Sequence, residues 1–163
     1  MAKKIDPINK KQYGAVTVML TVNDVKAASA FYQKAFGFEK RGLMNGPDGK
    51  VMHGELRLRD TTLMLGPELH GARSAKTLGG SPATLYLLVE NADKVVAKAV
   101  KAGGKAVGPV ADMFWGDRCG MVSDPDGNVW MVATHVSEPT PAEMKKAMAA
   151  MAKQQASTAT SGS

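Results

Sequence analysis

Three polar side chains alternate along one predicted strand and are the first group in the chain that could do chemistry. His53, Glu55 and Arg57 are two residues apart, so in an extended chain they share one face. An imidazole titrates near neutral pH and a guanidinium can bind a carboxylate or phosphate, so this face could orient an anionic or polar ligand. The alternative is the exposed polar face of a half-buried strand, because apolar residues alternate with all three.

A second group lies in the segment 113–118, which reads MFWGDR. Trp115, with Phe114 beside it, could stack on a planar ligand, and Arg118 could bind a carboxylate or phosphate. In the alternative interpretation, Trp115 packs between two halves of the chain and Asp117 pairs with Arg118 or with a backbone amide. Both interpretations place this segment near the mouth of a site.

The other reactive residues give weaker signals. Cys119 follows Arg118, but no base for a catalytic dyad is identifiable. No two histidines have the spacing of metal ligands, and we expect His135 to be structural and His70 to be exposed. The chain has no glycine-rich phosphate loop, and its basic residues are not interleaved with aromatic ones, so neither a nucleotide cofactor nor nucleic acid is predicted as a partner.

The elements that carry these residues occur twice. The stretch MLTVNDVKAASAFYQKAFG begins at Met19, and 67 residues later YLLVENADKVVAKAVKAGG begins at Tyr86. An internal repeat of this kind fixes the architecture before any residue is given a role. Two copies are too few for a solenoid, so we expect the halves to pack on each other and to share a cavity.

Each half predicts a βαβββ module, which makes the fold class α+β. Alternation, capping residues and turns place strands at 15–22, 39–44, 51–59 and 62–65 in the first half and at 83–89, 106–110, 117–123 and 128–134 in the second. Asn23 or Asp24 is expected to cap the first helix, which ends at Gly37, and Asn91 to cap the second. In the first strand we expect four residues to face the core: Val16, Val18, Leu20 and Val22. We expect Trp130 in the core and the Tyr86 hydroxyl near polar groups.

The predicted organisation is a single domain with extensions at both ends. It comprises a flexible arm (1–12), the domain (13–136, with modules at about 13–66 and 82–136 and a linker at 67–81), an amphipathic helix (137–155) and a disordered tail (156–163). Pro141 suits the first position of that helix, and methionines recur along one side of it. The linker has no periodicity and is rich in Gly, Pro and Ser.

Composition excludes several classes. A chain of 163 residues with 44% hydrophobic and 22% charged residues is an ordinary globular domain, and no apolar run of about 18 residues predicts a membrane span. One cysteine cannot form an internal disulfide, and the first residues lack the apolar core of a secretion signal, so we expect a cytoplasmic protein without a membrane partner. The net charge of +6 includes four lysines in the arm, which indicates solvation more than an anionic partner.

The duplicated plan, with MLTVNDVKAASAFYQKAFGFE near the start and DPDGNVW near the end, resembles the vicinal oxygen chelate superfamily of glyoxalases, extradiol dioxygenases and bleomycin resistance proteins. The resemblance covers residues 13–136, and the run FWGDRCGMVSDPDGNVWMVATHVSEPTPAEM is similar to its PhnB-like branch. This implies two modules that form a curled mixed sheet around a shared cavity, with the helices outside. In metal-dependent members, His or Glu from the first and fourth strands of each module hold a divalent metal.

Carried over onto this chain, those four ligand positions are Thr17, Met64, Thr84 and Met131. Both first-strand positions and both fourth-strand positions are 67 residues apart, which supports the alignment. A hydroxyl is a weak donor, and a thioether is too soft for the metals of such sites. We therefore predict no metal and no cofactor.

The first hypothesis is a metal-free protein that binds an aromatic or antibiotic-like small molecule as a homodimer, as the resemblance to bleomycin resistance proteins implies. Methionines suit such a site because they form an adaptable apolar wall, although they also fill irregular cores. The predicted ligand-binding residues are Thr17, Met19, His53, Glu55, Arg57, Met64, Thr84, Tyr86, Trp115, Arg118 and Met131. One alternative is an enzyme: either a glyoxalase-like lyase or isomerase, or other enzyme of the superfamily, with an off-pattern site around His53 and Glu55, or a metal-free acid–base catalyst. Another is a protein-interaction module that acts through the C-terminal helix.

Overall fold

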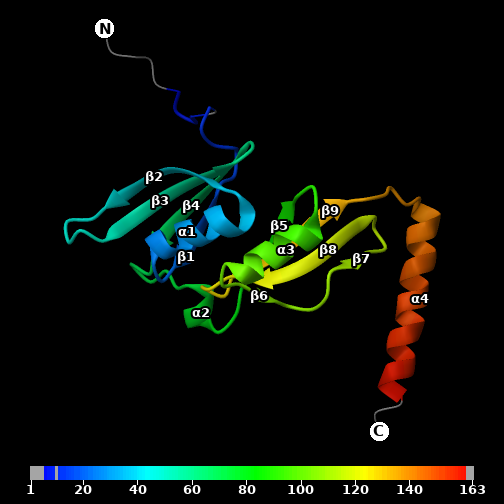
Figure 1. The fold of residues 1–163 in the computed structure, drawn as a ribbon. Helices are drawn as coiled ribbons and strands as arrows, with labels where there is room; N and C mark the ends of the chain where they lie inside the picture. The colour runs from blue at the N-terminus through cyan, green and yellow to red at the C-terminus, as the bar shows by residue number, and fades with distance from the viewer. Residues whose placement is uncertain (1–5, 10, 161–163) are drawn as a thin grey trace.

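The structure is a computed structural model that describes residues 6–9 and 11–160, with side chains up to Lys153. Two modules lie side by side (Figure 1). Module 1 comprises β1 (Val18–Val22), α1 (Val25–Phe36), β2 (Glu39–Asn45), β3 (Val51–Leu58) and β4 (Thr61–Pro67). Its strand order is β1-β4-β3-β2, with β1 parallel to β4 and the other pairs antiparallel.

Module 2 repeats this order. It comprises β5 (Thr84–Leu88), α3 (Ala92–Lys101), β6 (Lys105–Ala106), β7 (Ala111–Asp112), β8 (Asp117–Ser123) and β9 (Val129–His135), in the order β5-β9-β8-β6 with β7 paired to β8. The α+β class and the two-module plan are confirmed. The single strand predicted at 106–110 is wrong: two short strands replace it, because Gly108 has a φ of 102° and Pro109 has no amide hydrogen for a ladder.

The helix caps follow the sequence. Asp24 caps α1 by accepting a hydrogen bond from the Ala27 amide at 2.8 Å, and Gly37 ends the helix at a φ of 79°. Asn91 caps α3 in the same way through the Lys94 amide. Sequence analysis missed α2 (Ala75–Leu78), a single turn inside the predicted linker.

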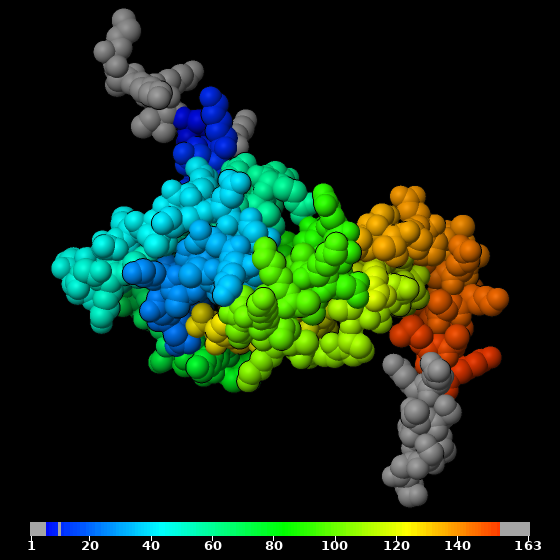
Figure 2. Space-filling model, viewed as in Figure 1, coloured from blue at the N-terminus to red at the C-terminus, as the bar shows by residue number. Residues whose placement is uncertain are grey.

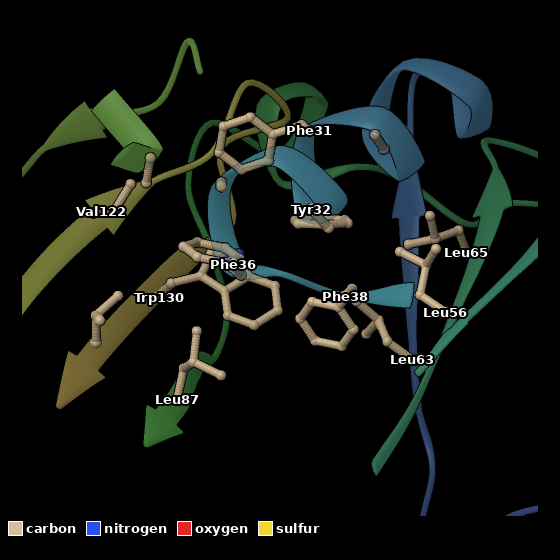
Figure 3. Packing of buried hydrophobic residues seen from close by; sticks show 14 of the residues in the cluster. Phe31, Tyr32, Phe36, Phe38, Leu56, Leu63, Leu65, Leu87, Val122 and Trp130 are labelled. Carbon is tan, nitrogen blue, oxygen red and sulfur yellow. The ribbon is translucent and has the colours of Figure 1, made fainter. Parts of the chain in front are cut away.

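An aromatic core on the helix side of both sheets joins the modules (Figure 3). The ring centroids of Phe36 from α1 and Trp130 from β9 are 4.8 Å apart, and Tyr32 stacks on Phe36. The Tyr32 hydroxyl donates to Asp124 Oδ2 at 2.6 Å, and burial raises the pKa of this hydroxyl. Trp130 is 3% exposed, which confirms its predicted place in the core.

The open faces of the two sheets follow from this packing. Because the large aromatic residues gather on the helix side, the opposite faces retain exposed apolar side chains; Met19 is 58% exposed and Tyr86 48%. The sheets are curled but not closed. The expectation that both modules enclose one cavity therefore needs correction: each module presents an open face.

The start of β1 also differs from the prediction. The strand begins at Val18, where β4 first pairs with it through Leu63, and not at residue 15. Upstream of that point the chain leaves the sheet, so Val16 is 88% and Val18 40% exposed. Of the four residues predicted to face the core, Val22 is buried and Leu20 packs against the core.

The C-terminal helix α4 (Pro141–Thr160) lies at the outer end of module 2, away from module 1 (Figures 1 and 2). Thr140 and Glu143 cap it reciprocally, because the Thr140 amide donates to Glu143 Oε2 and the Glu143 amide donates to Thr140 Oγ1. Pro141 takes the predicted first position, and the helix continues five residues past the predicted end at 155. Residues 161–163 of the predicted tail lie outside the described residues. No helix in the described part of the chain is long and apolar enough to cross a membrane.

Candidate functional site

Most of the predicted ligand-binding residues lie on the open faces, where side chains point away from the helices. On the module 1 face, Met64 pairs with Met19 on one side and with Glu55 on the other. On the module 2 face, Met131 pairs with Tyr86 and with Met121. Strand alternation thus brings predicted residues from separate strands together, as it must when one face is the site.

The module 1 face is covered in part by the N-terminal segment. The Tyr13 hydroxyl donates to Glu55 Oε1 at 2.5 Å, and His53 Nε2 lies 3.5 Å from the same oxygen. The hydrogen bond from Tyr13 lowers the pKa of Glu55, and the same bond raises the pKa of Tyr13. Glu55 is therefore an ionised acceptor near neutral pH.

Three donors of the same face converge on one backbone oxygen. The Gln12 carbonyl accepts from Thr62 Oγ1 at 2.7 Å, from Arg57 Nη1 at 3.1 Å and from Arg41 Nη1 at 3.4 Å. Of these donors, only Arg57 is among the predicted ligand-binding residues. Thr62 is two residues before Met64 in the same strand, so alternation could have placed it on this face. No local signal in the sequence shows that Gln12 lies against the face.

The module 2 face holds a polar cluster centred on Asp117. Its Oδ2 accepts from the Tyr86 hydroxyl and from Trp115 Nε1, the latter at 3.2 Å, and its Oδ1 lies 2.8 Å from His135 Nδ1. The bond from Tyr86 lowers the pKa of Asp117, which in turn raises the pKa of His135. Burial, followed by the bond to Asp117, raises the pKa of Tyr86. The predicted polar surroundings of the Tyr86 hydroxyl are confirmed.

Arg118 does not join this cluster. Alternation along β8 places it on the helix side, where its guanidinium bonds Asp93 at 2.7 Å and Asp112 at 2.9 Å. The pairing of Asp117 with Arg118, one option of the alternative interpretation, is therefore not formed, because consecutive residues of a strand point to opposite faces. The partner of Asp117 Oδ1 is instead His135, a residue expected from the sequence to have a structural role.

A groove of about 540 Å³ runs between the modules. Thr62 of module 1 and Thr84 and Tyr86 of module 2 line it. One of the three donors that hold the Gln12 carbonyl, Thr62, therefore lies on the same groove as Tyr86 of the module 2 face. Arg59 spans the same seam, with its Nη2 donating to the Leu88 carbonyl at 2.7 Å.

The four superfamily ligand positions do not fit a hard divalent metal. Thr17 immediately precedes β1, Thr84 begins β5, and Met64 and Met131 occupy the open faces. Hydroxyl and thioether groups lack the charge and hardness that such ions select. No group of three or more His, Cys, Asp or Glu residues in the described ranges is arranged to hold a metal ion.

Neither the Cys119 thiol nor the Asp117 carboxylate is placed to attack a substrate. Cys119 lies 3.6 Å from the Tyr86 hydroxyl but is fully buried, so its thiol cannot reach a substrate. Every oxygen of Asp117 already has a partner, which makes this carboxylate an anchor for the rings of Tyr86 and Trp115. The result is a pair of fixed aromatic side chains beside an apolar methionine.

Two repeats of one βαβββ plan, with four strands in module 1 and five in module 2, each carry a helix on one face and leave the opposite face open; they define a class of folds built from a duplicated module. A family model places the chain within that class: it belongs to the Glyoxalase/Bleomycin resistance protein/Dioxygenase superfamily, whose model matches residues 14–132.

The chain is also similar to individual proteins. An uncharacterized protein of Mycobacterium tuberculosis is 38% identical over 139 residues, which cover 82% of each chain. The solved structure of an Arabidopsis thaliana gene product has a TM-score of 0.63 at 32% identity, over 74% of this chain and 98% of that one. TioX from Micromonospora sp. has a TM-score of 0.60 at 23% identity, over 76% of this chain and all of that one, and so shares the fold.

Proposed function

We propose that this protein binds a small aromatic or antibiotic-like molecule without a metal ion, and that it belongs to the PhnB-like branch of the superfamily. The observation that carries the proposal is the anchoring of Tyr86 and Trp115 on Asp117. Aromatic rings that are fixed before a ligand arrives lose little conformational entropy on binding. Met131 lies beside them and supplies an adaptable apolar surface.

A homodimer is part of this proposal. Met19, Tyr86 and Leu88 on the open faces are between 47% and 58% exposed, which is unusual for large apolar side chains in one region. A second copy would cover these faces and enclose the groove. Sedimentation equilibrium tests this part directly. A protein that is still monomeric at about 100 times the concentration used to measure ligand binding would overturn it.

Ligand binding can be tested with matched methionine variants. A thermal-shift screen of planar aromatic natural products is expected to yield stabilising compounds, and calorimetry then gives their affinities. Met64→Gln and Met131→Gln should weaken binding by about tenfold, because each replaces an adaptable apolar side chain by an amide. Met148→Gln is the control, because Met148 lies on α4 and is 57% exposed. The proposal fails if no compound binds or if all three variants bind alike.

A second candidate is a metal-free acid–base enzyme. The 3.5 Å approach of His53 to Glu55 favours it, because an imidazole oriented by a carboxylate is a common general acid or base in enzymes. Chelator-treated protein would then convert the hemithioacetal of methylglyoxal and glutathione, and His53→Gln would abolish the conversion. Turnover that is absent from the native chain, or unchanged in His53→Gln, removes this candidate.

A further inference from the structure

The contacts of the Gln12 carbonyl show what the module 1 face is built to bind. Two guanidinium groups, of Arg41 and Arg57, and the hydroxyl of Thr62 all donate to this one neutral oxygen. Three donors on a single acceptor are more than a peptide carbonyl needs, since it has two lone pairs. The same donors would satisfy both oxygens of a carboxylate.

The charges on the module 1 face also favour a carboxylate ligand. No ion pair joins Arg41 or Arg57 to a carboxylate within the described residues. Glu55, the acidic residue of this face, has the Tyr13 hydroxyl and His53 as its close partners, and Arg41 acts on it only through its charge, which adds to the lowering of the Glu55 pKa. Two positive charges therefore converge on a neutral group, an arrangement that gains energy when an anion replaces it.

The position of these donors in the fold indicates which chemical group the rest of the ligand carries. Thr62 lines the groove that also contains Tyr86, so a molecule bound at the donors would extend toward the aromatic part of the module 2 face. We propose that Arg41, Arg57 and Thr62 form a carboxylate-binding subsite for an aromatic acid, and that residues 11–13 act as a strap that the carboxylate displaces. This inference rests on the proposed binding function and names its ligand class.

The strap makes the same contacts that the ligand would make. The Gln12 carbonyl stands in for a carboxylate oxygen, and Tyr13 places a phenol on the face with its hydroxyl on Glu55. Its hydrogen bonds with the face are therefore lost when the acid binds. Loosening the strap is expected to tighten ligand binding. The observed affinity depends on the fraction of molecules whose subsite is free, and the strap lowers that fraction by filling the subsite.

The probes are 4-hydroxybenzoate and its neutral isostere 4-hydroxybenzamide, measured by calorimetry on the full chain. The acid should bind about tenfold more tightly than the amide. Arg57→Met or Arg41→Met should remove this preference, and Tyr13→Ala should tighten acid binding by about fivefold. Lys40→Met is the charge-matched control, because Lys40 is exposed beside Arg41 and should change acid binding by less than about twofold.

A second readout follows the strap itself. With 3-fluorotyrosine at all three tyrosines, the resonance that Tyr13→Phe removes should move toward its free-solution position when the acid is added. Arg41 is exposed, so its variant is expected to fold even if Arg57→Met does not.

The outcomes separate this inference from the proposed function. Equal binding of acid and amide, insensitive to Arg41→Met, overturns the carboxylate subsite and leaves aromatic binding in place. An unmoved Tyr13 resonance at saturating acid overturns the strap. Failure of both probes, together with an unproductive screen of aromatic compounds, overturns the two proposals at once.

Discussion

The open face of β3 carries an imidazole, a carboxylate and a guanidinium, whereas the three corresponding positions of β8, its counterpart in module 2, carry a thiol, a thioether and a hydroxyl; Asp117 lies outside these positions, at the start of β8. The strands correspond because Glu55 pairs with Met64 as Met121 pairs with Met131. The residues concerned are His53, Glu55 and Arg57 on β3 and Cys119, Met121 and Ser123 on β8. Module 1 thus has a charged face under a strap, and module 2 has a mainly apolar face with its polar cluster at one end.

The helix-facing sides of the two modules differ much less. Gly54 of β3 and Gly120 of β8 occupy corresponding positions, paired with Leu65 and Val132. A Cβ at Gly54 would come within 3.1 Å of Val25, and one at Gly120 within 2.9 Å of Val96. Close packing of a helix on the sheet requires glycine in both places. The duplicated plan is therefore retained where the core constrains it, and the two faces differ where ligands would bind.

The largest expected effect lies at the hairpin turns, where the modules also differ. Asp124 in the β8–β9 turn is 5% exposed and accepts from Tyr32, from Trp130 Nε1 and from two backbone amides. Asp124→Ala leaves these donors unpaired and should lower the free energy of unfolding by about 3 kcal/mol or more. Asp60→Ala in the exposed β3–β4 turn is the control, with an expected change within about 0.5 kcal/mol. Urea unfolding of both variants decides, and similar losses would contradict the assigned role of Asp124.

An intermediate effect is expected at the polar cluster of module 2. Its Asp117–His135 pair stabilises the fold most between the ordinary Asp pKa of 3.8 and the ordinary His pKa of 6.5. The contribution of Asp117 disappears as pH falls through its lowered pKa in the folded protein. The contribution of His135 disappears as pH rises through its raised pKa in the folded protein. In Asp117→Asn, an NMR titration should show the His135 pKa shifted down. Glu138→Gln, which removes the weaker contact to the same imidazole, should shift it less.

The difference between the modules also marks the limit of what the sequence predicts. The repeat, the helix caps and strand alternation are local signals, and they predicted the sequence of strands and helices along the chain, the core position of Trp130 and the methionines on both faces. Closure of the sheets depends on which surfaces the modules bury against each other, which no local pattern encodes. The contact of Gln12 with Thr62 joins residues 50 positions apart, and the choice of His135 by Asp117 depends on β8–β9 pairing.

The smallest expected effect concerns the strap on module 1. Tyr13→Phe removes one hydrogen bond to a partly exposed carboxylate and should lower the free energy of unfolding by about 0.5–1 kcal/mol at pH 7. The loss should vanish as pH falls through the lowered pKa of Glu55, because a protonated carboxyl no longer favours this bond, and again as pH rises through the raised pKa of Tyr13. Glu55→Gln should reduce the effect of Tyr13→Phe in a double-mutant cycle measured by urea unfolding. Additive effects would show that the Gln12 carbonyl alone holds the strap. The strap that distinguishes the module 1 face from the module 2 face would then not depend on Glu55.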